Sequence, residues 1–331
     1  MTRWDDWTWE ERSQPADTPT APAAIDATAA GEASPAAAGG GGRQTPQVFR
    51  RRRAAAGGVA LVVVVALIAA VASKGGSGKA HDPVRAHTAK LTPSAAAQAA
   101  AREAGEQQAI DHVLSYTSAV TSGGSSGEEV ALTFDDGPGP YTLRLVAELN
   151  RLKVHATFFA IGNQEQYFSA GTAAEVESGD VVGDHTETHP MMAQLSPHDQ
   201  YDELFEQMAQ IEVVGAKRPR LFRPPYGSFD ATTFKELHHL RLLMVLWSVD
   251  TADYTLPGTQ AIVQRALAGA KPGAIILMHD AGGERSQTIA ALPAIVAGLR
   301  KRGLEPVTVP QLLKDDPPPP GQPIPTALSG G

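Results

Sequence analysis

Two adjacent carboxylates, Asp135 and Asp136, end the apolar run Val130–Phe134 and are followed at once by Gly137 and Pro138. Adjacent carboxylates repel each other, and neither can be buried cheaply without a cation or a proton. One interpretation is a strand end whose acids cap the next helix, because Asp is common in turns and caps. The other is a pair of acids with a chemical task, and this stretch alone does not choose between them.

A second group of candidate side chains is the histidine pair in "DHTETHP", His185 and His189, which follows the short apolar run Val181–Val182. The spacing of four predicts both imidazoles on one side of a helical turn, a common way to chelate a metal. Taken alone, such a pair more often marks two solvated histidines. The chain has no Cys, so any metal must be held by His, Asp or Glu, and the acid pair is a second source of ligands.

Three more apolar runs end in residues that could do chemistry. The run Leu221–Phe222 precedes "RPPYG", in which two prolines predict a rigid extended loop that exposes a backbone N–H. The run Leu242–Val249 precedes "DTADY", and the run Ala274–Met278 ends at a single histidine. A surface turn, turn-forming acids and a structural histidine are the ordinary explanations of each. Five such endings in one chain are much less probable as an accident than any one of them alone.

The elements that must position these residues alternate regularly between Glu128 and about Leu313. The expected strands are Val130–Phe134, Ala156–Ile161, Val181–Val182, Leu221–Phe222, Leu242–Val249, Ala274–Met278 and Pro306–Val309. Helical stretches between them include Leu143–Leu152, His198–Val214, Thr232–Leu240, Thr259–Ala270 and Thr288–Arg302. Alternating strands and helices predict a parallel α/β architecture, either a barrel or an open sheet. In both, chemistry gathers at the carboxyl ends of the strands.

The segments "TFDDGP", "HTETH", "RPPYG", "DTADY" and "LMH", in this order, resemble the five motifs of the polysaccharide deacetylases, also called carbohydrate esterase family 4 or the NodB-homology domain. The resemblance covers about residues 128–313. It implies an α/β fold, a distorted (β/α) barrel with an incomplete number of strands, and an Asp-His-His metal site. Two departures stand out: Tyr254 where many members have Trp, and Asp184 where Asn or Ser is common.

The resemblance divides the labour of the two acids. It implies that Asp136, His185 and His189 bind a divalent metal, usually Zn2+, with Co2+, Ni2+ and Mn2+ as alternatives. Asp135 is implied to stay off the metal and to act as general base, and Arg223 is implied to pair with it and keep it anionic.

The same resemblance implies roles for the other strand-end residues. The backbone N–H of Tyr226 would help the metal hold the oxyanion, and His279 would protonate the departing amine. Asp253 would orient His279 and keep it charged. Leu277 and Tyr254 would line the pocket for the acetyl methyl group.

The expected activity is metal-dependent removal of N-acetyl groups from N-acetylglucosamine in a polysaccharide. Peptidoglycan is ranked first, chitin or poly-N-acetylglucosamine second and acetylxylan, through an O-acetyl ester, third. A metal-dependent glycan-binding module without catalysis is the alternative of another class, which the presence of Asp135 and His279 disfavours. A zinc peptidase is disfavoured because Glu187 sits one position too late for the HExxH pattern.

Composition shifts sharply along the 331 residues. Residues 1–53, rich in Ala, Gly, Pro, Ser and Thr, are expected to be a disordered cytoplasmic tail. The apolar run Ala54–Ser73 next to the basic cluster Arg50–Arg53 predicts a transmembrane signal anchor. Cleavage near Ala72, giving a secreted protein, is the alternative. The domain after the anchor is therefore expected outside the cytoplasm.

Three further segments complete the expected organisation. Residues 74–91 read as a linker, residues 92–122 as an Ala-rich stalk helix whose last turns dock on the next domain, and residues 315–331 as a Pro-rich disordered tail. The catalytic domain is expected over 128–313. The formal net charge of -8 argues against a nucleic-acid partner. The expected partners are the polysaccharide and the membrane, and no protein partner is inferred.

Overall fold

The computed structural model describes residues 95–324. The expected cytoplasmic tail, transmembrane anchor and linker, residues 1–91, lie outside the described residues, as do residues 325–331. Among the described helices, none is both long enough and apolar enough to cross a bilayer.

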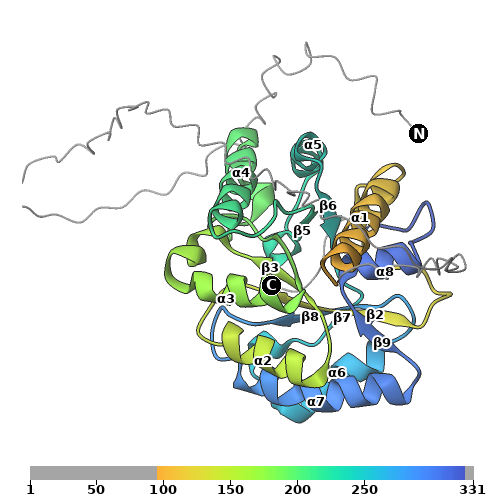
Figure 1. Ribbon diagram of the computed structural model, residues 1–331. Coiled ribbons are helices and arrows are strands. Elements are labelled where there is room, and N and C mark those ends of the chain that lie inside the picture. Colours follow the sequence, from red (N-terminus) through yellow and green to blue (C-terminus); the bar gives the residue numbers. More distant parts are fainter. Residues whose placement is uncertain (1–94, 325–331) are drawn as a thin grey trace, which may run out of the picture. The chain divides into compact units, whose positions relative to one another are not determined.

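Nine strands form one sheet in this part of the chain, and all their pairings are parallel (Figure 1). Their order along the sheet is β1 (Ala119–Val120), β6 (Leu243–Val245), β5 (Leu221–Phe222), β4 (Val181–Asp184), β3 (Thr157–Ala160), β2 (Glu129–Asp135), β8 (Ile275–His279) and β7 (Val249–Asp250). The short strand β9 (Glu305–Val307) also pairs with β2.

The sheet curls back on itself. The strands β6 and β7, expected as one strand over 242–249, are separate pieces of nearly continuous chain that pair at opposite ends of the sheet, with β5 and with β8. This arrangement agrees with the expected distorted barrel of parallel strands. The carboxyl ends of β2, β4, β5, β7 and β8 therefore converge on one rim.

The alternation of side chains along β2 decides which of them reach that rim. Val130, Leu132 and Phe134 belong to a core cluster with α2 (Thr142–Leu152), α6 (Thr259–Gly269) and α7 (Ser286–Lys301), which lie together on one side of the sheet in Figure 1. Thr133 and Asp135 alternate with them and point to the opposite face. Both are buried, so the fold carries a carboxylate into its interior.

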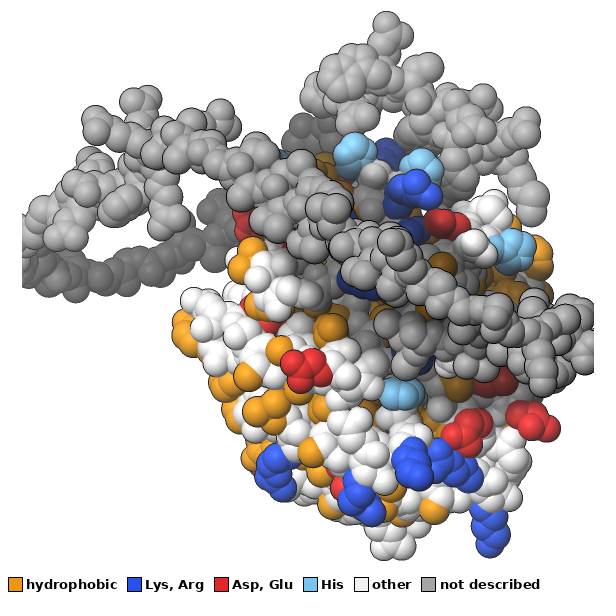
Figure 2. All heavy atoms as spheres, viewed as in Figure 1, with side chains coloured by type: hydrophobic (Ala, Val, Ile, Leu, Met, Phe, Trp, Pro, Cys, Tyr) orange, Lys and Arg blue, Asp and Glu red, His pale blue; other side chains and the backbone are white. Residues whose placement is uncertain are grey.

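The remaining helices cover the rest of the sheet. They are α1 (Ala95–Leu114), α3 (Glu165–Ser178), α4 (Pro197–Val213), α5 (Ala231–Leu240) and α8 (Val309–Asp315), with short 3-10 turns at Gly162–Gln164, Met192–Gln194, Pro225–Gly227 and Asp253–Thr255. On the face shown in Figure 2, Lys and Arg side chains are spread over the region of α2 and α7 among hydrophobic and other side chains. No single kind of side chain dominates that face.

The helix expected over 92–122 ends earlier than predicted, at Leu114. Ser115 Oγ donates to the carbonyl of His112 at 2.6 Å, and the chain then enters β1, which pairs with β6. The helix is therefore followed by a strand of the same sheet, and the expected domain boundary at 128 is wrong. As expected, the last turns of α1 dock on the domain: Ile110 and Val113 are buried in a cluster with Leu312 of α8.

The tail expected to be disordered from 315 is wrong for its first ten residues. Gln322 accepts a hydrogen bond from the Thr121 N–H at 2.7 Å, and Pro318 accepts one from the Tyr116 hydroxyl at 2.8 Å. Asp316 accepts the N–H groups of Ser126 and Gly127, both at 2.7 Å. The side chains of Gln322 and Asp316 thus satisfy backbone N–H groups that follow β1, and the Tyr116 hydroxyl before β1 donates to the tail. These contacts fix the tail against the domain.

Two of the described helices were not predicted from the sequence. Helix α3 fills the connection between β3 and β4, and α8 replaces the end of the strand expected over Pro306–Val309. Thr308 caps α8 by accepting the Gln311 N–H, and Pro310 stands in its first turn. Both features are start signals of a helix.

Candidate active site

A cavity of about 720 Å³ opens at the carboxyl ends of the strands. Eight of the ten residues expected at the site line it, namely Asp135, Asp136, His185, His189, Tyr226, Tyr254, Leu277 and His279. The other two, Arg223 and Asp253, lie behind the lining and contact it through Asp135 and His279. The structure thus gathers all five strand endings at one place.

The three expected metal ligands face one another. Asp136 Oδ1 lies 3.1 Å from His189 Nε2 and 3.6 Å from His185 Nε2, and the ligand atoms of the three residues all lie within 4.8 Å of one another. Burial raises the pKa of Asp136, but the hydrogen bonds from the two histidines outweigh it and hold that pKa well below its usual range. His185 Nδ1 lies 2.7 Å from the Arg223 carbonyl, to which it donates, leaving Nε2 free for a metal.

The histidines do not lie on a helical turn, so that part of the prediction is wrong. Thr186 and His189 have φ of 69° and 64°, in the left-handed region that ends a right-handed helix. The chain turns sharply at these two residues and brings the imidazole rings to a centroid distance of 4.9 Å. Asp136 and Tyr226 are also left-handed, with φ of 73° and 57°. Such backbone strain clusters at functional sites.

The second acid of the pair, Asp135, has a different partner. Its Oδ1 accepts a hydrogen bond from Arg223 Nη1 at 2.7 Å, and both side chains are buried. The Arg223 guanidinium also donates to the hydroxyl of Thr133 at 2.8 Å and to the carbonyl of Val245 at 2.9 Å, and it stacks over the ring of Phe159. A buried charge needs such a full set of partners. One carboxylate oxygen of Asp135 is therefore bound by the Arg223 guanidinium.

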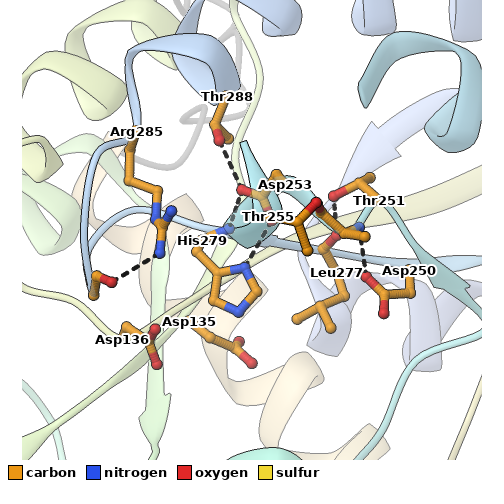
Figure 3. Close-up of polar contacts among 12 residues, drawn as sticks. Asp135, Asp136, Asp250, Thr251, Asp253, Thr255, Leu277, His279, Arg285 and Thr288 are labelled. Carbon is orange, nitrogen blue, oxygen red and sulfur yellow. Dashed lines mark hydrogen bonds and ion pairs between the residues drawn. The ribbon is translucent and has the colours of Figure 1, made fainter. Parts of the chain in front are cut away.

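The third feature is a histidine paired with a buried acid (Figure 3). Asp253 Oδ1 accepts from His279 Nδ1 at 2.7 Å, and Asp253 Oδ2 accepts from the His279 N–H at 3.0 Å and from the Thr288 hydroxyl at 2.7 Å. Burial lowers the pKa of His279, but the hydrogen bond and charge of Asp253, with the charges of Asp136 and Asp135, raise it to about 9. His279 is therefore a cation at neutral pH, and its ring points toward the acid pair.

Aromatic and apolar side chains form the rest of the wall. Leu277 lies two residues before His279 on β8 and is 4% exposed. The ring of Tyr254 meets the ring of His279 edge to face, with centroids 5.4 Å apart. The hydroxyl of Tyr226 lies 3.2 Å from His189 Nδ1. Many members of the family that this sequence resembles have Trp at the position of Tyr254. The tyrosine ring still contacts His279, the expected general acid.

A loop after β8 closes the cavity beside Asp136. The buried side chain of Arg285 donates to the carbonyls of Ala281, Glu284 and Gly282 at 2.6, 2.9 and 3.0 Å, which pins the loop (Figure 3). Gly282 has φ of 70°, and a Cβ at this position would overlap with Asp136 Oδ2. The loop backbone therefore stands directly against the carboxylate oxygen that faces away from the histidines.

Sequence reasoning missed several residues that support the site. Thr133 and Thr288 hold Arg223 and Asp253, and Arg285 pins the closing loop. Thr133 carried a readable signal, because it lies two residues before Asp135 and thus on the same face of a strand. No local pattern pointed to Thr288 or Arg285, which act through contacts set by the fold.

Comparison with known proteins places the chain among relatives. A family model described as polysaccharide deacetylase matches residues 122–245. A peptidoglycan-N-acetylglucosamine deacetylase of Bacillus cereus is 37% identical over 188 residues, which cover 56% of this chain and 88% of that protein. A chitooligosaccharide deacetylase of Bradyrhizobium is 36% identical over 201 residues, which cover 57% and 92%.

The fold agrees with this relationship. A crystal structure of a peptidoglycan N-acetylglucosamine deacetylase in complex with 4-naphthalen-1-yl-N-oxidanyl-benzamide superposes with a TM-score of 0.58 at 30% identity, covering 60% of this chain and 94% of that one. The five strand-end motifs, the curled parallel sheet and these similarities lead to one conclusion. The chain belongs to the polysaccharide deacetylase family, carbohydrate esterase family 4.

Proposed function

We propose that this deacetylase removes N-acetyl groups from N-acetylglucosamine units of a cell-wall or extracellular polysaccharide, with peptidoglycan as the first candidate. The observation that carries the proposal is the division of the acid pair. Asp135 is held by Arg223, Asp136 faces two histidines, and a charged His279 stands on the same cavity. Candidates for the base, the metal ligands and the acid thus line or adjoin one cavity. The named activities of the relatives support the same reaction class.

The donor set of Asp136, His185 and His189 fits a divalent metal. Two imidazole nitrogens and one carboxylate oxygen are ligands that zinc prefers, and three protein ligands leave positions open for water and substrate. We therefore propose Zn2+, with Co2+, Ni2+ or Mn2+ as alternatives. When bound, the metal would supply Lewis-acid activation of water and of the acetyl carbonyl. The contact of His185 Nδ1 with the Arg223 carbonyl orients its Nε2 toward this position.

Asp135 is the general base of the proposed reaction. Its Oδ1 is occupied by Arg223, while its Oδ2 lies 3.9 Å from His185 Nε2 and faces the reacting centre. The guanidinium binds Oδ1 and prevents the carboxylate from rotating, so Oδ2 is free to take the proton of the attacking water. The backbone N–H of Tyr226 would donate to the oxyanion of the tetrahedral intermediate.

His279 completes the reaction from the other side. Its Nδ1–H is donated to Asp253, so in the cationic form its second proton is on Nε2. As the C–N bond breaks, this proton passes to the departing nitrogen, and the products are acetate and a free amino sugar. Leu277 and Tyr254 would enclose the acetyl methyl group. With acid, base and ligands all in place, the geometry favours an enzyme over a binding module without catalysis.

The test is acetate release by the purified full-length chain from peptidoglycan, chitooligosaccharides and acetylxylan, each measured with and without a chelator. Release from peptidoglycan that stops with the chelator and returns with zinc supports the proposal. Release from chitooligosaccharides alone assigns the activity to the second candidate substrate. Binding of these glycans without acetate release contradicts a catalytic role.

We also propose that residues 54–73 anchor the chain in the membrane with the catalytic domain outside the cytoplasm. The basic cluster Arg50–Arg53 beside the apolar run supports this orientation. Protease added to intact cells should digest the catalytic domain and spare the first 50 residues or so. A chain found only in the soluble cytosolic fraction contradicts the proposal, and a mature form that begins near Ser73 replaces the anchor with a cleaved signal.

A further inference from the structure

The turn that carries the two candidate histidine ligands, residues 185–189, is neither helix nor strand, yet each of its backbone N–H groups has an acceptor. The five bonds are His185 to the Ala160 carbonyl (3.0 Å), Thr186 to Asp184 Oδ1 (2.7 Å), Glu187 to the Glu203 carbonyl (2.9 Å), Thr188 to Glu203 Oε2 (2.8 Å) and His189 to Thr186 Oγ1 (2.9 Å). Two acids outside the metal site, Asp184 and Glu203, thus recur in this network.

The first of them, Asp184, is the last residue of β4 and is fully buried. Its carboxylate fixes the N–H of Thr186, whose φ of 69° is one that a β-branched residue rarely adopts. The hydroxyl of Thr186 in turn accepts the N–H of His189. The side chain of Asp184 therefore reaches one candidate ligand through a single intermediate residue.

The backbone of Asp184 reaches the other ligand. Its carbonyl accepts the N–H of Arg223 at 2.9 Å, and the carbonyl of Arg223 accepts from His185 Nδ1 at 2.7 Å. The ring of His185 and the backbone of His189 are therefore both held from one strand end. Asp184, the residue that departs from the common pattern of the family, is therefore linked by hydrogen bonds to both histidines.

The second acid, Glu203, comes from α4 and holds the far end of the turn. Its two carboxylate oxygens accept the N–H and the hydroxyl of Thr188, at 2.8 and 2.6 Å, and Thr188 immediately precedes His189. Within residues 95–324, no Lys or Arg forms a salt bridge with Glu203. Its hydrogen bonds are directed at the turn.

We propose that Asp184 and Glu203 are positioning residues for the metal-binding histidines, which hold the turn so that both Nε2 atoms face Asp136 before a metal binds. The inference rests on the proposed metal site and deepens it. If the turn is released, metal binding has to order it, and affinity falls even though every ligand is present. Loss of such supporting contacts typically weakens metal affinity by about 10–100-fold.

The test measures zinc affinity of the full-length chain by competition with a chromophoric chelator, without any substrate. Glu203→Ala removes both hydrogen bonds to Thr188 and should raise the Kd for zinc by about 10–100-fold. Glu203→Gln can still accept the Thr188 N–H and donate to its hydroxyl, so its Kd should stay near that of the wild type. Glu206→Ala is the matched control, because it removes an exposed acid one turn further along α4.

The Asp184 variants provide the second arm. Asp184→Asn keeps an oxygen for the Thr186 N–H and should bind zinc like the wild type, whereas Asp184→Ala should bind it about 10–100-fold more weakly. Thermal melting of the metal-free variants shows whether each is folded. If Asp184→Ala is not folded, the zinc affinities of the variants at the half-buried Glu203 test the inference.

Three results contradict the inference. Unchanged zinc affinity in folded Glu203→Ala and Asp184→Ala shows that the turn needs neither acid. Equal losses of zinc affinity in Glu203→Ala, Glu203→Gln and Glu206→Ala show that negative charge, and not hydrogen bonding, supports metal binding. A wild-type chain that binds no zinc contradicts the proposed metal site and this inference with it, which separates that failure from the first two.

Discussion

The buried acid Asp253 keeps His279 charged, and Asp253→Asn should remove that charge within the working pH range. Burial alone lowers the pKa of His279, and the hydrogen bond and charge of Asp253 are the largest contributions that raise it to about 9. Without them the burial penalty remains, and the pKa should fall to the ordinary histidine value of about 6.5 or below. At pH 8 the protonated fraction then falls from roughly 0.9 to roughly 0.03, which is a loss of about 30-fold in the active acid form.

The direction of the pH dependence follows from the role of the acid. As the proposed general acid, His279 would act in its protonated form, so the rate should be full below its pKa and fall as the pH rises through that pKa. Asp253→Asn should therefore shift the alkaline limb of kcat/KM toward lower pH. A divalent ion bound by Asp136 should lower the pKa of His279 in both the wild type and Asp253→Asn. The two proteins are therefore compared at the same metal loading.

The amide at position 253 has a second effect. Asp253 accepts three hydrogen bonds, from the Nδ1 and backbone N–H of His279 and from Thr288. An amide nitrogen cannot accept, so either the His279 ring loses its acceptor or the two donors to Oδ2 lose theirs. If the amide nitrogen faces the ring, His279 is held neutral with its proton on Nε2, and the general acid is lost below pH 8 as well.

The assay is acetate release across pH, combined with an NMR titration of the labelled His279 ring in the same variants. Asp250→Asn is the control, because Asp250 lines the same cavity but accepts the Ala252 N–H at 2.7 Å instead of contacting His279. Its alkaline limb should stay at the wild-type position. If the alkaline limb of kcat/KM and the titration of the His279 ring both coincide in Asp253→Asn and the wild type, the claim that Asp253 keeps His279 charged is refuted.

Two further substitutions test the supports of the acid pair. Arg223→Met leaves Asp135 buried without a cation and should lower the free energy of unfolding by about 3–5 kcal/mol, measured by urea denaturation; a loss within the range of an ordinary surface substitution contradicts the buried ion pair. Gly282→Ala pushes a Cβ against Asp136 Oδ2 and should weaken zinc binding, whereas Gly303→Ala, with a similar φ of 75° and nothing within 4 Å of the added Cβ, should cost only the backbone strain of about 1 kcal/mol. Equal zinc affinities in these two glycine variants would show that the closing loop does not constrain Asp136.

Much of the site was predictable because parallel strands bring their carboxyl ends to one rim. That rule, applied to five strand ends, selected Asp135, His185, Arg223, Asp253 and His279 without any knowledge of their contacts. The face on which Asp135 lies followed from alternation along β2. The contact of Arg223 with Asp135, implied by the resemblance, is confirmed at 2.7 Å.

The rest depended on contacts between distant parts of the chain. The spacing of His185 and His189 suggested a helical turn, but a left-handed backbone at Thr186 achieves the same meeting of rings. That backbone is held by Asp184, and the far end of the turn is held by Glu203 from α4. The expected disorder after residue 315 was wrong because Gln322 bonds to a segment about 200 positions earlier. Local composition carries no information on such pairs.

The central claim is that the two adjacent acids have different tasks, and paired zinc content and kcat in two variants test it most directly. Asp135→Asn keeps the shape and removes the proton acceptor, so it should retain stoichiometric zinc while kcat falls by about 10²–10⁴-fold. Asp136→Ala removes an anionic ligand, so zinc itself should be lost, and excess metal should restore part of the activity. If Asp135→Asn loses zinc while Asp136→Ala keeps it, the two roles are exchanged and the account is contradicted.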